Sequence, residues 1–97
     1  MPKAYWVAHV DVDDMEGYKS YISANADAFA KYGAKFLVRG GNKEVREGHN
    51  RARTVVIEFK DFETAKACYE SEVYQNAIKL RLPHATADME IIEGYDG

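Results

Sequence analysis

The stretch Arg53-Thr54-Val55-Val56-Ile57-Glu58-Phe59 predicts a β-strand, because β-branched and aromatic residues fill most of it. Asp61 follows two residues later, where its carboxylate can accept a hydrogen bond from the first turn of a helix. A strand is therefore expected to lead directly into a helix at this point in the chain.

Further strand and helix signals lie on both sides of this pair. Asp13 and Glu16 have the spacing of a capping box, Gly33 follows the end of an apolar helical repeat, and Ser71 can cap a second part of the later helix before Pro83. The segment 43–47 fits either a further strand or a hairpin arm. The expected strands are 5–12, 35–39, 53–59 and 89–93, and the expected helices are 14–32 and one helix in two parts, 61–69 and 72–82.

The resulting order, β-α-β-β-α-β, is the split arrangement of ferredoxin-like α+β domains. It predicts a four-stranded antiparallel sheet with its first and third strands in the centre and both helices on one face. With 97 residues, 46% of them apolar and 30% charged, the chain is expected to form a single domain, 1–97.

Both faces of the predicted sheet are largely apolar. Strand 5–12 carries Trp6, Ala8 and Val10 on one parity and Tyr5 and Val7 on the other. Two helices cover only one face of such a sheet, and soluble monomers rarely expose a large apolar patch. The pattern therefore predicts a homodimer that packs the second faces together.

Charge and motif content exclude several classes of function. The formal net charge of −3 gives no basic excess for nucleic acid or anionic lipid, and the apolar start of the chain is too short for a signal or a membrane span, which favours the cytoplasm. Cys68 is the only cysteine and is expected to be buried, while His9, His49 and His84 fall in separate elements. The sequence contains no cofactor, metal or nucleotide motif, so neither a cofactor nor a metal ion is expected.

Five segments along the chain form a recognisable set: Phe36-Leu37-Val38-Arg39-Gly40-Gly41, Glu47-Gly48, Val55-Val56-Ile57-Glu58-Phe59, Cys68-Tyr69-Glu70-Ser71-Glu72-Val73-Tyr74-Gln75 and Glu93-Gly94. Together they resemble the bacterial DUF1330 family, a family of unknown function. The resemblance implies a dimeric α+β barrel, in which two sheets pack face to face, and it implies no established activity. Relatives of that superfamily include cofactor-independent monooxygenases with a pocket between the sheet and the helices.

Arg39 and Glu58 are charged residues in two otherwise apolar strands that should be neighbours, so they are expected to pair. Such a pair either holds an anion in a pocket or serves structure alone. His9 could act as an acid or base, or lie as a hydrogen-bonded histidine in the core or an interface. Tyr69 and Tyr74 lie on the helices that would cover such a pocket.

These residues favour the binding or conversion of a small acidic or aromatic molecule between sheet and helices. The alternative is a dimeric module without catalysis, and whether the chain is an enzyme stays open.

Overall fold

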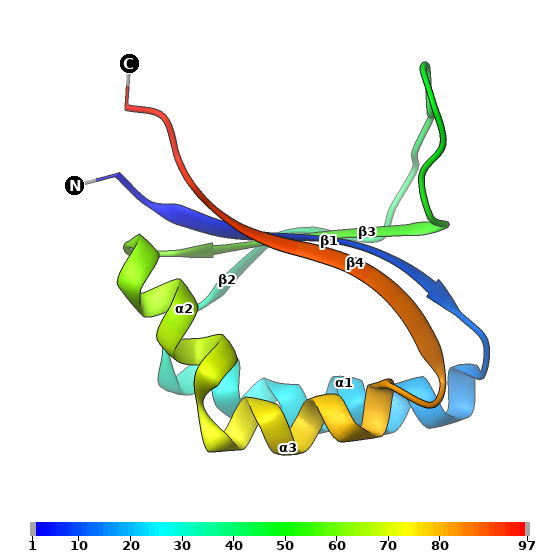
Figure 1. The fold of residues 1–97 in the computed structure, drawn as a ribbon, viewed down its shortest axis with the longest axis horizontal. Coiled ribbons are helices and arrows are strands. Elements are labelled where there is room, and N and C mark those ends of the chain that lie inside the picture. Colours follow the sequence, from blue (N-terminus) through cyan, green and yellow to red (C-terminus); the bar gives the residue numbers. More distant parts are fainter. Residues whose placement is uncertain (1, 97) are drawn as a thin grey trace.

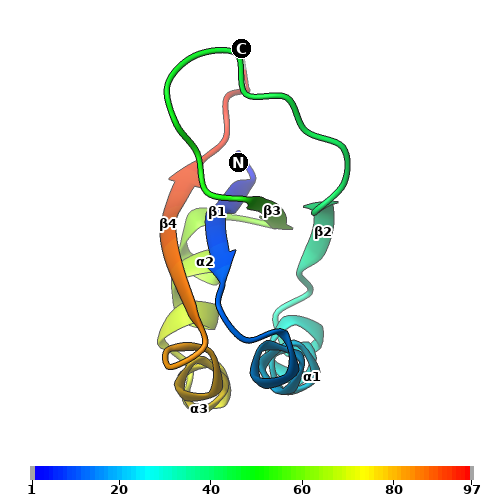
Figure 2. The same ribbon diagram turned by 90° about the vertical axis from the view of Figure 1, so that its right-hand side faces the viewer.

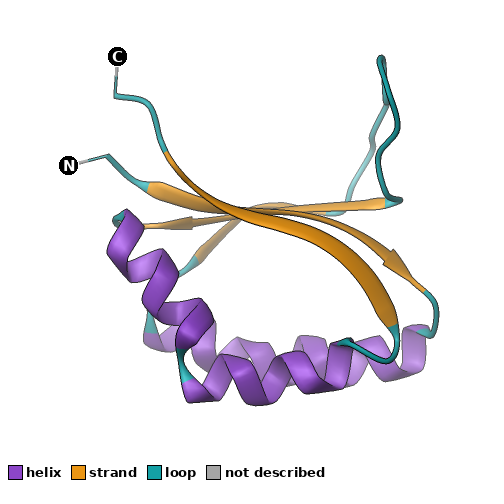
Figure 3. Cartoon of the chain, in the orientation of Figure 1, coloured by secondary structure: helices purple, strands orange, loops and turns teal. Residues whose placement is uncertain are grey.

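The computed structural model describes residues 2–96 as one four-stranded sheet with three helices on one side of it (Figure 1, Figure 3). The strand order is β2-β3-β1-β4 and every strand pair is antiparallel. This confirms the expected α+β class and the central position of the first and third strands. The elements are β1 (Ala4–Val12), α1 (Met15–Lys31), β2 (Lys35–Arg39), β3 (Arg53–Phe59), α2 (Phe62–Glu70), α3 (Glu72–Arg81) and β4 (Ala85–Glu93).

Local signals set the helix ends, with one exception. Asp61 accepts a hydrogen bond from the Thr64 N–H at 2.7 Å, as the sequence predicts. Helix α1, however, begins with Asp14 as its N-cap rather than Asp13, because the Asp14 carboxylate accepts from the Glu16 N–H at 3.1 Å. The expected two-part helix is two separate helices.

Ser71 separates α2 from α3. Its extended backbone ends α2, and its side chain accepts a hydrogen bond from the Tyr74 N–H at 3.2 Å while donating to the Cys68 carbonyl at 2.7 Å. The chain therefore changes direction between α2 and α3. Helix α2 packs against the sheet, and α3 lies beside α1 (Figure 1, Figure 2).

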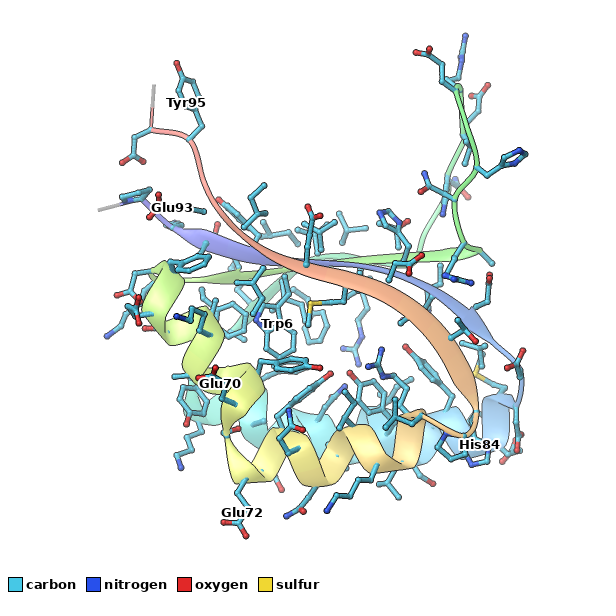
Figure 4. All side chains as sticks on the ribbon, in the orientation of Figure 1. Trp6, Glu70, Glu72, His84, Glu93 and Tyr95 are labelled. Atoms are coloured by element: carbon cyan, nitrogen blue, oxygen red, sulfur yellow. The ribbon has the colours of Figure 1, made fainter. Side chains whose placement is uncertain are left out.

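The face of the sheet that meets the helices carries the core. Trp6 is its centre: its indole ring lies 4.9 Å from the Tyr74 ring and 5.3 Å from those of Phe29 and Phe59, centroid to centroid. The indole N–H donates to the Ala65 carbonyl at 2.9 Å, which satisfies its polar group inside the core. Figure 4 shows Trp6 extending from the sheet into the space above the helices.

Strand β4 is longer than predicted, since it begins at Ala85 rather than Met89. Ala85, Ala87 and Asp88 weaken the strand signal at its start, because alanine and aspartate are depleted in strands. They still form strand because β1 pairs with β4 along its whole length, from Ala4 opposite Glu93 to Val12 opposite Ala85. Long-range pairing overrides local preference here.

The connection 40–52 contains no helix or strand, so the segment 43–47 is neither of the two predicted alternatives. It extends away from the helices (Figure 1, Figure 2). Arg51 fastens its base, with its guanidinium 3.0 Å from carboxylate oxygens of Asp11 and Asp88. The backbone N–H of Ala52 also donates to Asp11, and together with Arg51 it lowers the pKa of that carboxyl.

Within residues 2–96, no helix has the length and apolar composition that crossing a membrane requires. Cys68 is fully buried, as predicted, and this burial raises the pKa of its thiol to about 12.

Candidate functional site

A cavity of about 40 Å³ lies between the sheet and the helix pair α1–α3. Its sheet side is mainly apolar, and side chains with nitrogen and oxygen at their tips extend into the same space (Figure 4). The polar side chains that line it are Tyr18, Tyr21 and Asn25 from α1, Arg39 from β2, Arg53 from β3, and Tyr74 and Arg81 from α3.

Arg81 is the most deeply buried charge of the cavity. It lies in the last turn of α3, where only 9% of its surface is exposed, and its guanidinium carbon is 5.4 Å from the centre of the Tyr21 ring. Its buried Nε has no hydrogen-bond partner in the described chain. A buried donor without a partner costs roughly 1–3 kcal/mol, so this side chain needs a compensating acceptor.

A β-bulge places Arg39 at the same cavity. The register of β2 on β3 shifts between Phe36, opposite Ile57, and Val38, opposite Val56, so Arg39 lies opposite Val55 on the helix side. Its guanidinium packs 4.3 Å from the centre of the Phe36 ring.

Arg53 enters the cavity from the start of β3, and its Nε is also buried without a partner within residues 2–96. Gly40 makes room for it. This glycine has a φ of +75°, and a Cβ there would lie 3.0 Å from Arg53 Nη1, so a larger residue would meet both backbone strain and a close contact. The glycine in the turn after β2 thus leaves space for the Arg53 guanidinium.

None of these three arginines forms an ion pair in the part of the chain that the structure describes. The described residues that line the cavity include no aspartate or glutamate. Three arginine side chains therefore line one small space without a carboxylate to balance them, with Arg81 buried, Arg53 half-buried and Arg39 exposed.

Tyrosine hydroxyls and one amide complete the lining. The Tyr21 and Tyr74 hydroxyls are 2.7 Å apart, and only 2% of Tyr74 is exposed. Burial raises the pKa of Tyr74; it also raises that of Tyr18, where Tyr21 adds to the effect and Arg53 opposes it. The Tyr18 and Tyr74 hydroxyls therefore stay protonated, and the buried Asn25 amide lines the same cavity.

The arrangement suits an oxyanion. Guanidinium groups bind carboxylates with paired, charge-assisted hydrogen bonds, and protonated hydroxyls and amides donate further ones. A carboxylate in the cavity would meet donors from α1, β3 and α3 at once.

The structure divides the site residues that the sequence suggested. Arg39 and Tyr74 line the cavity. Tyr69 lies next to it, with its ring centre 5.3 Å from that of Tyr74. His9 and Glu58 point from the other face of the sheet, so they are separated from the cavity by the sheet itself.

The expected pair of Arg39 and Glu58 is wrong. Glu58 lies opposite Lys35 in the ladder, and its carboxylate is 3.3 Å from Lys3 Nζ and 3.4 Å from the Tyr5 hydroxyl. The bulge explains the error, because it moves Arg39 to the helix side while Glu58 stays on the opposite side.

On that outer face, the His9 Nδ1 lies 3.1 Å from the Thr54 hydroxyl in the neighbouring strand. The contact agrees with the expectation of a hydrogen-bonded histidine, which lies on the outer face of the sheet rather than in the core.

Sequence reasoning missed Asn25, Arg53 and Arg81. A signal exists for two of them: Asn25 falls in the apolar repeat of α1, and Arg81 lies seven residues after Tyr74 on the buried side of α3. A polar residue inside an apolar stripe could have marked both. Arg53 gives no such signal, because it stands at the start of a strand.

Comparison with known proteins places the chain in a family. The family described as "Domain of unknown function (DUF1330)" matches residues 3–95, and the chain belongs to it. No curated protein matches the sequence.

Solved structures with the same fold are distant in sequence. The RPA0582 protein of unknown function from Rhodopseudomonas palustris is 15% identical, with a TM-score of 0.77 over 99% of this chain and 85% of its own. A dimeric ferredoxin-like protein of unknown function from Jannaschia sp. CCS1 is 14% identical, with a TM-score of 0.68 over 95% and 99%. SnoaB, a cofactor-independent oxygenase from Streptomyces nogalater, is 11% identical, with a TM-score of 0.66 over 100% and 97%. At these identities the likeness shows the fold alone.

Proposed function

We propose that this member of the DUF1330 family binds a small organic carboxylate in the cavity between the sheet and the helices. The observation that carries the proposal is that Arg53 and the buried Arg81, with the more exposed Arg39, line one space whose described lining has no acidic side chain. A bound carboxylate would supply the acceptors that the buried Nε atoms of Arg53 and Arg81 lack.

The energetics support an anionic ligand. An ion buried without a partner destabilises a protein by several kcal/mol, whereas hydrogen bonds to charged groups contribute about 1.5–3 kcal/mol each. Binding therefore removes a penalty and adds a favourable term at Arg81. A carboxylate is favoured over a neutral ligand for this reason.

Binding, rather than oxygenation, is the activity proposed. The cavity offers guanidinium, hydroxyl and amide groups, which hold an anion well. The oxygenase activity named for the Streptomyces protein belongs to a chain that shares only the fold with this one.

We also infer that the protein works as a homodimer through the outer face of the sheet. Tyr5, Val7 and Val56 lie in the two central strands there and are only partly covered in the single chain. The connection 40–52 and residues 94–96 extend on this same side and flank the face (Figure 1). The dimeric relative from Jannaschia supports this assembly.

The binding proposal is tested by calorimetric titration of the purified protein with benzoate and with hexanoate at low ionic strength. The test compares the wild type with Arg81→Met, and with Arg46→Met as a matched control that removes the same charge from an exposed position. Loss of a charge-assisted hydrogen bond at about 1.5–3 kcal/mol predicts an affinity about ten- to hundredfold weaker in Arg81→Met. Arg46→Met should bind like the wild type.

Two results would reject the proposal. If the wild type binds neither acid, the alternative of a dimeric module without a small-molecule ligand is favoured. If Arg46→Met weakens binding as much as Arg81→Met, general charge rather than the cavity attracts the anion.

A further inference from the structure

A groove on the surface adjoins the cavity. It lies along the edge strand β4, has a volume of about 370 Å³, and is lined by Tyr69, Arg81, Ala87, Met89 and Ile91. Arg81 and Met89 also line the inner cavity, so these two side chains stand between the enclosed space and the open groove.

The groove and the cavity differ in chemistry. Ala87, Met89 and Ile91 alternate along β4 on the helix side of the sheet and cover roughly 13 Å of strand. With the Tyr69 ring they form an apolar wall, and Arg81 at the inner end is the one charged group among the described lining residues. A groove that offers apolar side chains beside a buried cation fits a molecule with one apolar and one anionic end.

The volumes of the cavity and of the groove also favour a ligand with a small anionic head and a longer apolar part. A water-sized group needs about 10–15 Å³ of such space, so the 40 Å³ cavity holds about three of them, the number of heavy atoms in a carboxylate. Any larger part of a ligand must lie outside the cavity, and the groove is the space that adjoins Arg81.

We propose that the ligand is a carboxylate with an apolar tail, such as a medium-chain alkanoate, whose head contacts Arg81 in the cavity and whose tail lies in the groove beside Tyr69, Met89 and Ile91. This inference rests on the proposed function and names the class of acid that the site selects. The tail gains affinity by leaving water, and the head gains it from the guanidinium.

The test is a titration series on the full chain with butyrate, hexanoate, octanoate and 1-octanol at low ionic strength. Each methylene that enters the groove contributes about 0.8 kcal/mol, which corresponds to a roughly three- to fourfold gain in affinity per carbon. Octanoate should therefore bind more than a hundredfold tighter than butyrate. 1-Octanol, which has the same tail without the charge, should bind at least tenfold more weakly than octanoate.

Ala87→Trp fills the groove and leaves all three arginines in the sequence, and Asn76→Trp, at an exposed position of α3, is the matched control. The groove variant should bind all three acids with the affinity of butyrate, whereas the control should keep the dependence on chain length. The melting temperature of each variant, measured in parallel, confirms that it is folded.

The outcomes separate this inference from the proposed function. If the three acids bind wild-type protein equally well, the tail does not lie in the groove, although the carboxylate site stands. If Ala87→Trp keeps the full dependence on chain length, the tail lies elsewhere and the inference is wrong. If no acid of any length binds, the proposed function and this inference fail together.

Discussion

Replacing Arg81 with methionine is expected to make the ligand-free protein more stable while it removes carboxylate binding. Arg81 is 9% exposed, its Nε has no acceptor in the described chain, and no acidic side chain among residues 2–96 pairs with it. Methionine fills a similar volume with apolar atoms and adapts to irregular space. The buried charge and the unpaired donor both disappear.

The size of the gain follows from opposing terms. The loss of the contact between the guanidinium and the Tyr21 ring, at 5.4 Å, costs about 0.5–2 kcal/mol. Relief of an unsatisfied donor returns about 1–3 kcal/mol, and removal of an unpaired buried ion returns several more. A net stabilisation of roughly 2 kcal/mol or more is therefore expected, and each kcal/mol raises Tm by roughly 4–8 °C in a domain of this size.

The assay is thermal unfolding followed by circular dichroism, in a buffer free of organic acids and at one protein concentration, since dimerisation makes Tm depend on concentration. The protein should first be unfolded and refolded, so that no acid from the expression host remains bound. Arg46→Met is the control: its ion pair with Glu44 is exposed on both sides, so its loss should change stability by at most about 1 kcal/mol.

A fall in Tm for Arg81→Met, with Arg46→Met unchanged, would refute the reasoning. It would mean that the Arg81 guanidinium is fully satisfied in the free protein and serves to hold α3 against α1.

Three further predictions concern other parts of the molecule. Burial raises the pKa of the Cys68 thiol to about 12, so this thiol should resist alkylation at pH 8 in the native protein and react only after unfolding. The free energy of unfolding should fall between about pH 9 and 12, because only the thiol of the unfolded chain ionises in that range. Arg51→Ala should raise the pKa of Asp11, measured by carbon NMR of its carboxyl, without restoring it fully, because the backbone N–H that lowers it most remains; an unchanged pKa would contradict the assigned contact. Val56→Asp on the outer face should convert a dimer to a folded monomer in light scattering, and a variant that stays dimeric would place the interface elsewhere.

Local sequence predicts much of the fold. The strand 53–59, the cap at Asp61, the break at Ser71 and the order of the elements follow from residue type and spacing, because a turn or a cap involves neighbours along the chain. The order of the strands then follows from the order of the elements, since few topologies connect them without crossings.

Local sequence could not predict which face of each strand packs against the helices. Alternation divides β1 into two sets of side chains, and both sets are largely apolar, so their pattern could not tell which one meets the helices. Contact with the helices decides it: Trp6 packs against Phe29 and Tyr74, whereas Val7 stays on the other side.

Local sequence also predicted only part of the candidate site. The sequence by itself predicted a pocket between sheet and helices, with Arg39, Glu58, His9, Tyr69 and Tyr74 as its candidate lining. Tertiary structure alone decided that a bulge turns Arg39 away from Glu58 and that Arg53 and Arg81 meet it from two other elements. The physical reason is that a cavity forms where separate elements fail to fill the space between them, and that space depends on contacts between residues far apart in the chain.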